Sequence, residues 1–217
     1  MVEYVKYDTP KGPKMFKFGR YSFSTLEFKH LTIAFFMITL TIMALQRGFL
    51  NQSNQINLVS FIIIFFFSVG LGFLLHELAH KLIAQYYGFI SEFRADFFML
   101  FLSFLVASIF HVTFLAPGAV MILGRPTIKQ NGKISVAGPL VNLSLALIYI
   151  LLFVLLSPVP DSFLYILLSV GILVNAFLGI FNMLPFWILD GKKVWAWNKP
   201  IYLSVMGLLL LILILFI

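Results

Sequence analysis

The sequence contains no cysteine, which excludes disulfide bonds, a thiol nucleophile and any metal site built on cysteine ligands. Charged residues are also scarce: they make up 11% of the 217 residues, whereas 61% are hydrophobic. A soluble domain of this size does not need so much apolar surface. The composition therefore predicts a polytopic membrane protein.

The few charges are mostly basic and give a formal net charge of +7. Such an excess can indicate a nucleic-acid-binding protein, but here the charges flank apolar segments instead of gathering on one face. That placement is typical of membrane topology signals. We expect the lipid bilayer as a partner, and no nucleic acid.

Apolar stretches long enough to form membrane-spanning helices occur five times along the chain. They lie at Leu31–Leu45, Leu58–Tyr87, Ile134–Leu156, Phe163–Leu184 and Ile201–Ile217. Ser24–Glu27 is a capping-box pattern that predicts the start of the first helix. Gly88 predicts the end of the second helix, and Arg125–Lys133 predicts a polar turn before the third. We expect an all-α polytopic membrane protein, with residues 1–217 forming one domain.

A further apolar region, Phe97–Leu123, is broken by Pro117 and Gly118. We expect it to be a re-entrant helix followed by an extended segment, with minor β-strand content near residues 113–135. Aromatic residues interleaved with Lys17 and Arg20 predict another short extended segment, lying at the lipid headgroups. A solvated tail fits that pattern equally well.

The strongest chemical signal is an H-E-x-x-H sequence, His76 to His80, at the end of an apolar run. On a helix the two imidazoles lie one turn apart on the same face and can bind one Zn²⁺. Glu77 is then placed to act as general base. Leu58–Leu75 contains no charge, so the motif lies at membrane depth, where polar groups are costly unless they serve a function. The alternative is a polar cluster that packs helices together.

A catalytic zinc needs a third protein ligand. Asp190 is the main candidate, because it follows a proline-broken stretch just after a span and precedes Gly191, which would let the backbone turn back towards the site. His111 is the competing candidate. Asp190 can meet His76 and His80 only if an even number of crossings separates them, which requires the 97–123 region to return to the side from which it entered.

The distribution of lysine and arginine tests the two topologies. If Phe97–Leu123 crosses fully, the basic residues divide eight to seven between the two sides. If it is re-entrant, fourteen of the 15 lie on one side and only Arg47 lies on the other. The positive-inside rule favours the re-entrant topology, with a cytoplasmic amino terminus and the active site towards the cytoplasmic side of the cell membrane.

The ordered blocks His76–His80, Ala137–Asn142, Asn182–Pro185 and Leu189–Gly191 resemble the site-2 protease family of intramembrane zinc metalloproteases, in its compact form without a PDZ or CBS domain. The resemblance covers a catalytic core of about residues 58–194. It implies hydrolysis of peptide bonds in or next to the transmembrane helices of membrane-protein substrates.

Individual roles follow from the resemblance. It implies that His76, His80 and Asp190 bind one zinc ion per chain and that Glu77 is the catalytic base. It also implies that Asn142 holds the substrate or the developing oxyanion, although an amide at that depth can equally serve helix packing.

Pro117 and Gly118 lie in a stretch, Thr113–Leu123, that could hold a locally unwound substrate at an exposed strand edge. A different reading of the same metal ligands is a zinc transporter or a non-catalytic scaffold. A transporter has no need of Glu77 beside the ligands. The sequence indicates neither the substrate nor the oligomeric state.

Overall fold

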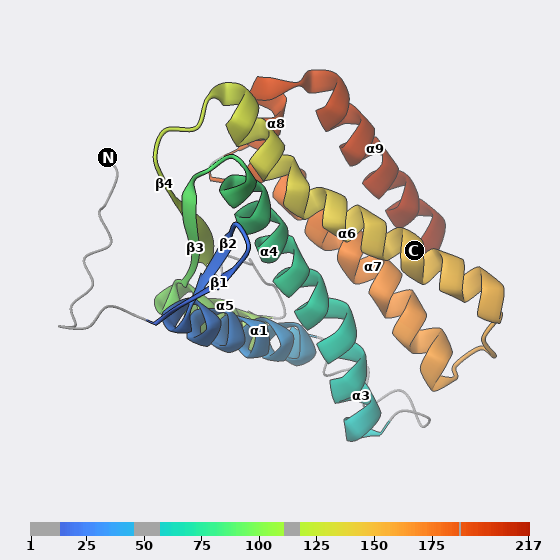
Figure 1. Cartoon of the computed structure of the whole chain (residues 1–217). Coiled ribbons are helices and arrows are strands. Elements are labelled where there is room, and N and C mark those ends of the chain that lie inside the picture. Colours follow the sequence, from blue (N-terminus) through green and yellow to red (C-terminus); the bar gives the residue numbers. More distant parts are fainter. Residues whose placement is uncertain (1–13, 46–56, 111–117, 187) are drawn as a thin grey trace.

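The computed structural model describes residues 14–45, 57–110, 118–186 and 188–217 (Figure 1). Within these ranges, five helical stretches are long and apolar enough to cross a membrane. They are α1 (Thr25–Leu45), the continuous stretch from α3 (Leu58–Phe65) through η1 (Phe66–Gly70) to α4 (Leu71–Tyr86), then α6 (Ile128–Leu156), α7 (Phe163–Met183) and α9 (Lys199–Phe216). The predicted number of spans and the all-α membrane class are confirmed.

Two shorter helices and four strands complete the described structure. The helices are α5 (Phe97–Phe110) and α8 (Asp190–Trp197), and the strands are β1 (Met15–Phe18), β2 (Tyr21–Ser24), β3 (Ile90–Ala95) and β4 (Gly118–Leu123). The strands form two antiparallel pairs, β1 with β2 and β3 with β4. Strand content near residues 113–135 was predicted and is β4, while β3 lies outside that range. The extended segment predicted around Lys17 and Arg20 is the β1–β2 hairpin.

The predicted polar turn at Arg125–Lys133 is wrong, because α6 already begins at Ile128. Thr127 caps this helix: its hydroxyl accepts from the Gln130 amide, and the Gln130 side chain accepts from the Thr127 amide. This reciprocal cap outweighs the weak helix propensity of the residues that follow. Gly132 lies against Trp197 of α8, where a Cβ would collide with the indole.

The predicted start of the first membrane-spanning helix and the predicted end of the second are confirmed. Ser24 accepts a hydrogen bond from the Glu27 amide at the start of α1. The second span ends at Tyr86, followed by Gly88 with a φ of +83°, which favours glycine. The turn of π-helix at η1 was not predicted. Such turns widen a helix locally and are frequent at functional sites.

The 97–123 region returns to the end from which it departs. In the β3–β4 pair, Ile90 lies opposite Leu123 and Ala95 lies opposite Gly118. The chain leaves α4 along β3, continues through α5, and comes back along β4 to the point where α6 starts. Pro117 and His111 lie outside the described residues. The re-entrant path thus gives two crossings, α6 and α7, between the end of α4 and the start of α8.

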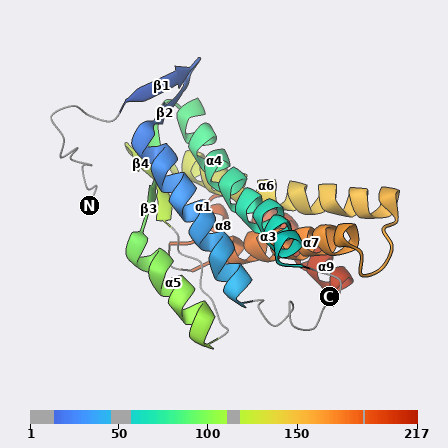
Figure 2. The ribbon, with the colours of Figure 1, turned by 90° about the horizontal axis from the view of Figure 1, so that it is seen from below.

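Buried apolar side chains form two clusters on either side of the motif helix. One joins α1, α3, η1, α4, β3, α5 and the first turns of α7, and the other joins α6, the rest of α7, α8 and α9. Viewed from below, α1 and α5 lie on one side of α3–α4, and α6, α7 and α9 lie on the other (Figure 2). The H-E-x-x-H helix therefore forms the centre of the helix assembly.

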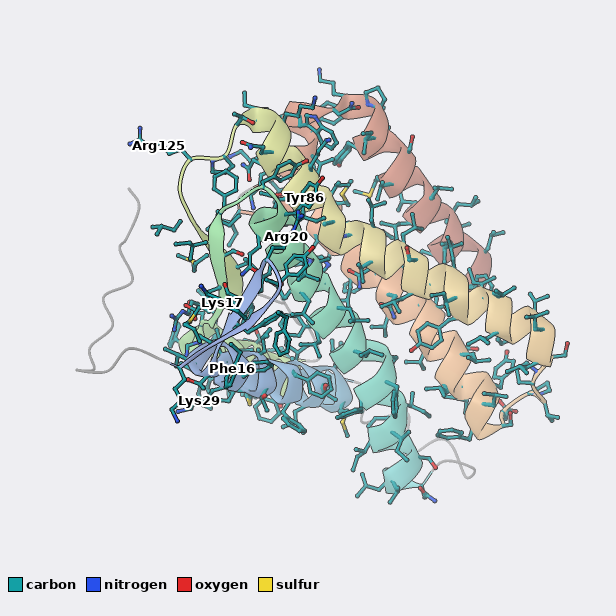
Figure 3. All side chains as sticks on the ribbon, viewed as in Figure 1. Phe16, Lys17, Arg20, Lys29, Tyr86 and Arg125 are labelled. Carbon is teal, nitrogen blue, oxygen red and sulfur yellow. The ribbon has the colours of Figure 1, made fainter. Side chains whose placement is uncertain are left out.

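All described lysines and arginines lie at one end of the helix assembly, where α1 begins, α4 ends and α6 begins. Lys17, Arg20, Lys29 and Arg125 mark this end in Figure 3. At the opposite end, the loop between α6 and α7 carries a single charge, Asp161. The fold thus separates the charges along the direction of the helices.

This separation predicts that the two ends face opposite sides of the membrane. Val159, in the α6–α7 loop, is 72% exposed, and Ile128, at the start of α6, is 70% exposed. In sealed vesicles, Val159→Cys and Ile128→Cys should react with an impermeant maleimide from opposite sides. The native chain has no cysteine, so background labelling is absent. Labelling of both positions from the same side would contradict the arrangement.

Candidate metal centre

His76 and His80 lie on one face of α4 and point their rings towards the same position. Their Nε2 atoms are 3.0 Å apart, and both side chains are buried. The i, i+4 spacing of the sequence produces this juxtaposition directly, because residues four apart lie on the same face of a helix.

Asp190 reaches the two histidines from the start of α8. Its Oδ2 is 3.0 Å from His80 Nε2 and 3.5 Å from His76 Nε2. In the part of the chain that is described, these residues form the group suited to hold a metal ion. His30, on α1, is engaged elsewhere, since its Nδ1 accepts from the Ala95 amide.

The outer ring nitrogens of both histidines are hydrogen-bonded in a way that fixes their tautomers. His76 Nδ1 donates to Asn142 Oδ1 at 2.6 Å, and His80 Nδ1 donates to the Ile134 carbonyl at 2.8 Å. Because these oxygens only accept, each Nδ1 carries the proton and each Nε2 presents a lone pair to the centre. Metal-binding histidines use the same arrangement.

The donor set fits zinc. Two imidazole nitrogens and one carboxylate leave one position of a tetrahedron open, as in catalytic zinc sites. Zinc–ligand bonds of about 2.0–2.1 Å place tetrahedral ligands roughly 3.3 Å apart, close to the spacing found here. Two lone pairs and a carboxylate facing one another without protons also need a cation between them.

Gly138 on α6 leaves room for this centre. A Cβ at this position would lie 2.5 Å from the Nε2 atoms of both His76 and His80. Pro139, next in the chain, lacks an N–H and so leaves the helix without one backbone hydrogen bond near Ile134, whose carbonyl binds His80. Gly138 therefore lets α6 approach the two ligands closely. Pro139 leaves α6 with one backbone hydrogen bond fewer beside them.

The start of α8 packs closely against the end of α7. A Cβ on Gly191 would collide with the Met183 and Leu184 carbonyls. Gly191 is helical, so the expectation that it turns the backbone is wrong, and it instead permits close contact.

Asn142 is fully buried behind His76 and uses both ends of its amide. Its Nδ2 donates to the Gly72 carbonyl at 3.3 Å and to Asn175 Oδ1 at 3.1 Å. Asn175 in turn donates to the Ser68 and Gly171 carbonyls. These contacts favour the orientation of His76 as the role of Asn142. Its contact with a substrate, suggested by the sequence, stays a prediction.

Glu77 lies next to His76 and is 9% exposed. Among the described residues, no hydrogen bond or ion pair engages its carboxylate. Gly118 begins β4 with a φ of +136°, and a Cβ there would strike the Arg94 carbonyl. Its backbone conformation thus requires glycine, and its role towards a substrate, like that of Pro117, stays a prediction.

Two groups outside the predicted set of site residues support this centre, Asn175 and the Ile134 carbonyl. Asn175 was visible as a polar residue within an apolar span, a signal of hydrogen bonding across helices. The Ile134 carbonyl had no signal of its own, because a backbone acceptor depends on the helix path.

Comparison with known proteins gives one informative match. A protein of Methanocaldococcus jannaschii, named "Putative zinc metalloprotease", is 42% identical over 173 residues, covering 79% of this chain and 88% of that protein. No protein-family profile matches the chain. No solved structure matches it either.

The position of Gly138 generates a prediction about metal binding. Gly138→Ala should lower zinc affinity at least about tenfold, because the new methyl group displaces both Nε2 atoms. Competition with a zinc chelator, which measures affinity, checks this. Gly207→Ala on α9 is the control, since a Cβ there meets nothing within 4 Å. Unchanged zinc affinity in Gly138→Ala would refute the arrangement of the ligands.

A second prediction tests whether the side-chain oxygen of Asn142, which accepts from His76, supports zinc binding. Asn142→Leu removes the acceptor for His76 Nδ1 and should weaken zinc binding about 10–100-fold. Asn142→Asp keeps an oxygen acceptor and should lose much less. Competition with a zinc chelator measures both. An equal loss in the two variants would show that the hydrogen bond to His76 is not what matters.

Proposed function

Because the chain belongs to the family of that Methanocaldococcus jannaschii protein, we propose that it is an intramembrane zinc metalloprotease of the site-2 protease type. It hydrolyses peptide bonds in or next to the transmembrane helices of membrane-protein substrates. The observation that carries this proposal is that Asp190 meets His76 and His80 beside Glu77. The two histidines and Glu77 lie on a helix long and apolar enough to span a membrane.

The residues of the centre divide the chemistry between them. His76, His80 and Asp190 hold one zinc ion per chain, while Asn142 and the Ile134 carbonyl orient the two imidazoles. The zinc ion supplies Lewis acidity for the scissile carbonyl and the attacking water. Glu77 accepts the proton of that water and delivers it to the leaving amine.

The depth of the centre matches cleavage within a membrane. His76 lies ten residues before Tyr86, the end of its span, which corresponds to about 15 Å along the helix axis. A transmembrane helix must unwind at the scissile bond to offer its carbonyl, since helical carbonyls are already hydrogen-bonded. The enzyme therefore needs an element that holds an unwound segment.

We assign this task to the edge of β4 opposite β3, which pairs with no further strand among the described residues. The Phe93 and Ala95 amides point away from β4, towards Glu27 and His30, so their cross-strand neighbours Val120 and Gly118 are non-hydrogen-bonded positions of the ladder. The backbone groups of Gly118 and Val120 then point to the open edge. A substrate segment can add there as a further strand.

The charge distribution supports an orientation. The end with the described lysines and arginines is placed in the cytoplasm by the positive-inside rule. The amino terminus and the active site then lie towards the cytoplasmic side of the cell membrane. The β1–β2 hairpin, with exposed Phe16 and Phe18 and a cation–π contact of Arg20 with Tyr86, sits at the headgroups.

The role of Glu77 is tested by Glu77→Gln. This variant should keep its zinc, because Glu77 is not a ligand, and should lose about 10²–10⁴-fold in kcat on a membrane-protein substrate. Zinc content and cleavage in proteoliposomes measure the two properties. Undiminished cleavage would refute the proposed chemistry and would leave zinc transport or a scaffold role as the alternative.

The role of the β4 edge is tested by Val120→Pro. Proline removes an N–H that points away from β3, so the β3–β4 ladder persists while a donor to the substrate is lost. We expect KM to rise about tenfold with unchanged zinc content. Val120→Ala, which shortens the side chain but keeps the N–H, is the matched control. Equal KM values in both variants would argue against strand addition.

A further inference from the structure

Two buried charges that the proposed chemistry does not use lie next to the metal centre. Lys81 directly follows His80 on α4 and is 1% exposed, and Glu27 on α1 is fully buried. Lys81 Nζ binds Glu27 Oε2 and also lies 4.1 Å from the centre of the Phe23 ring. Burying such a pair is often no more stable than apolar packing, so stability alone does not explain it.

Glu27 also contacts the β3–β4 sheet. Its second oxygen, Oε1, accepts from the Phe93 amide of β3 at 2.9 Å. The carboxylate does not complete the capping box to which its sequence position points. One carboxylate thereby joins α1, the motif helix α4 and β3.

Further hydrogen bonds join β3 to the same two helices, α1 and α4. His30 Nδ1 accepts from the Ala95 amide at 3.1 Å, and the Ser91 hydroxyl donates to the Lys81 carbonyl at 3.2 Å. Below them, the Phe93 ring packs against Phe73 of α4 with centroids 5.8 Å apart. The edge of β3 that faces away from β4 is thus bound to α1 and α4 by side chains. Its position relative to the motif helix depends on them.

We propose that Glu27 is a positioning residue that fixes the β3–β4 sheet against the motif helix. A substrate strand added at β4 then meets Glu77 and the metal ligands in a defined register. This inference rests on the proposed function. The contact on which it depends, the hydrogen bond from the Phe93 amide to Glu27, can be tested without a substrate.

Two double variants isolate that acceptor. Both Glu27→Gln/Lys81→Met and Glu27→Leu/Lys81→Met remove the ion pair without leaving a lone buried charge. Only glutamine keeps an oxygen for the Phe93 amide. We expect the glutamine variant to retain the KM of the native enzyme and the leucine variant to raise KM about tenfold. Zinc content and kcat should be the same in both, which a general loss of structure would not produce.

Spin labels provide a readout that needs no substrate. Tyr86 on α4 is 58% exposed and Met121 on β4 is 43% exposed, and the native chain has no cysteine to interfere. With labels at Tyr86→Cys and Met121→Cys, the distance distribution should broaden or shift in the leucine variant and stay unchanged in the glutamine variant.

The outcomes distinguish this inference from the proposed function. Equal KM values and equal distance distributions in the two double variants would overturn the positioning role of Glu27. If the native enzyme cleaved no membrane substrate, the proposed function would fail, while the distance measurement would still decide whether Glu27 holds the sheet.

Discussion

The arrangement depends on one electrostatic constraint: two imidazole lone pairs and a carboxylate face each other inside an apolar helix assembly. The Nε2 atoms of His76 and His80 are 3.0 Å apart, and Asp190 lies within 3.5 Å of both. Such donors repel one another unless a cation holds them together. The surrounding fold serves to bring them to one point and to keep each donor correctly oriented.

Close backbone approach makes this possible. Gly138 lets α6 touch both imidazoles, and Gly191 lets α8 press against the end of α7 so that Asp190 arrives at the ligands. On the opposite side of His76, Asn142 and Asn175 link the ring to the π-helical turn of its own span. Ligands, spacing residues and orienting amides come from four different helices. The centre therefore exists only in the assembled structure.

The sequence predicted those features that repeat or accumulate along the chain. Runs of apolar residues gave the five spans, and the count of basic residues gave the re-entrant path of the 97–123 region. Features set by contacts distant in the sequence were missed. The Glu27–Lys81 pair joins residues 54 positions apart in the chain, and the pairing of β3 with β4 joins residues 23 to 33 positions apart. The early start of α6 was missed because the polar stretch Arg125–Lys133 suggested a turn, whereas the Thr127 cap and the contact of Gly132 with Trp197 stabilise a helix.

X-ray absorption at the zinc edge of the purified, membrane-reconstituted protein tests the central claim most directly. The structure predicts one zinc per chain in a four-coordinate environment, with two imidazole nitrogens at about 2.0–2.1 Å and oxygen in the remaining positions. A protein that binds no zinc, or that binds it without imidazole, would contradict the assignment of His76, His80 and Asp190 as its ligands.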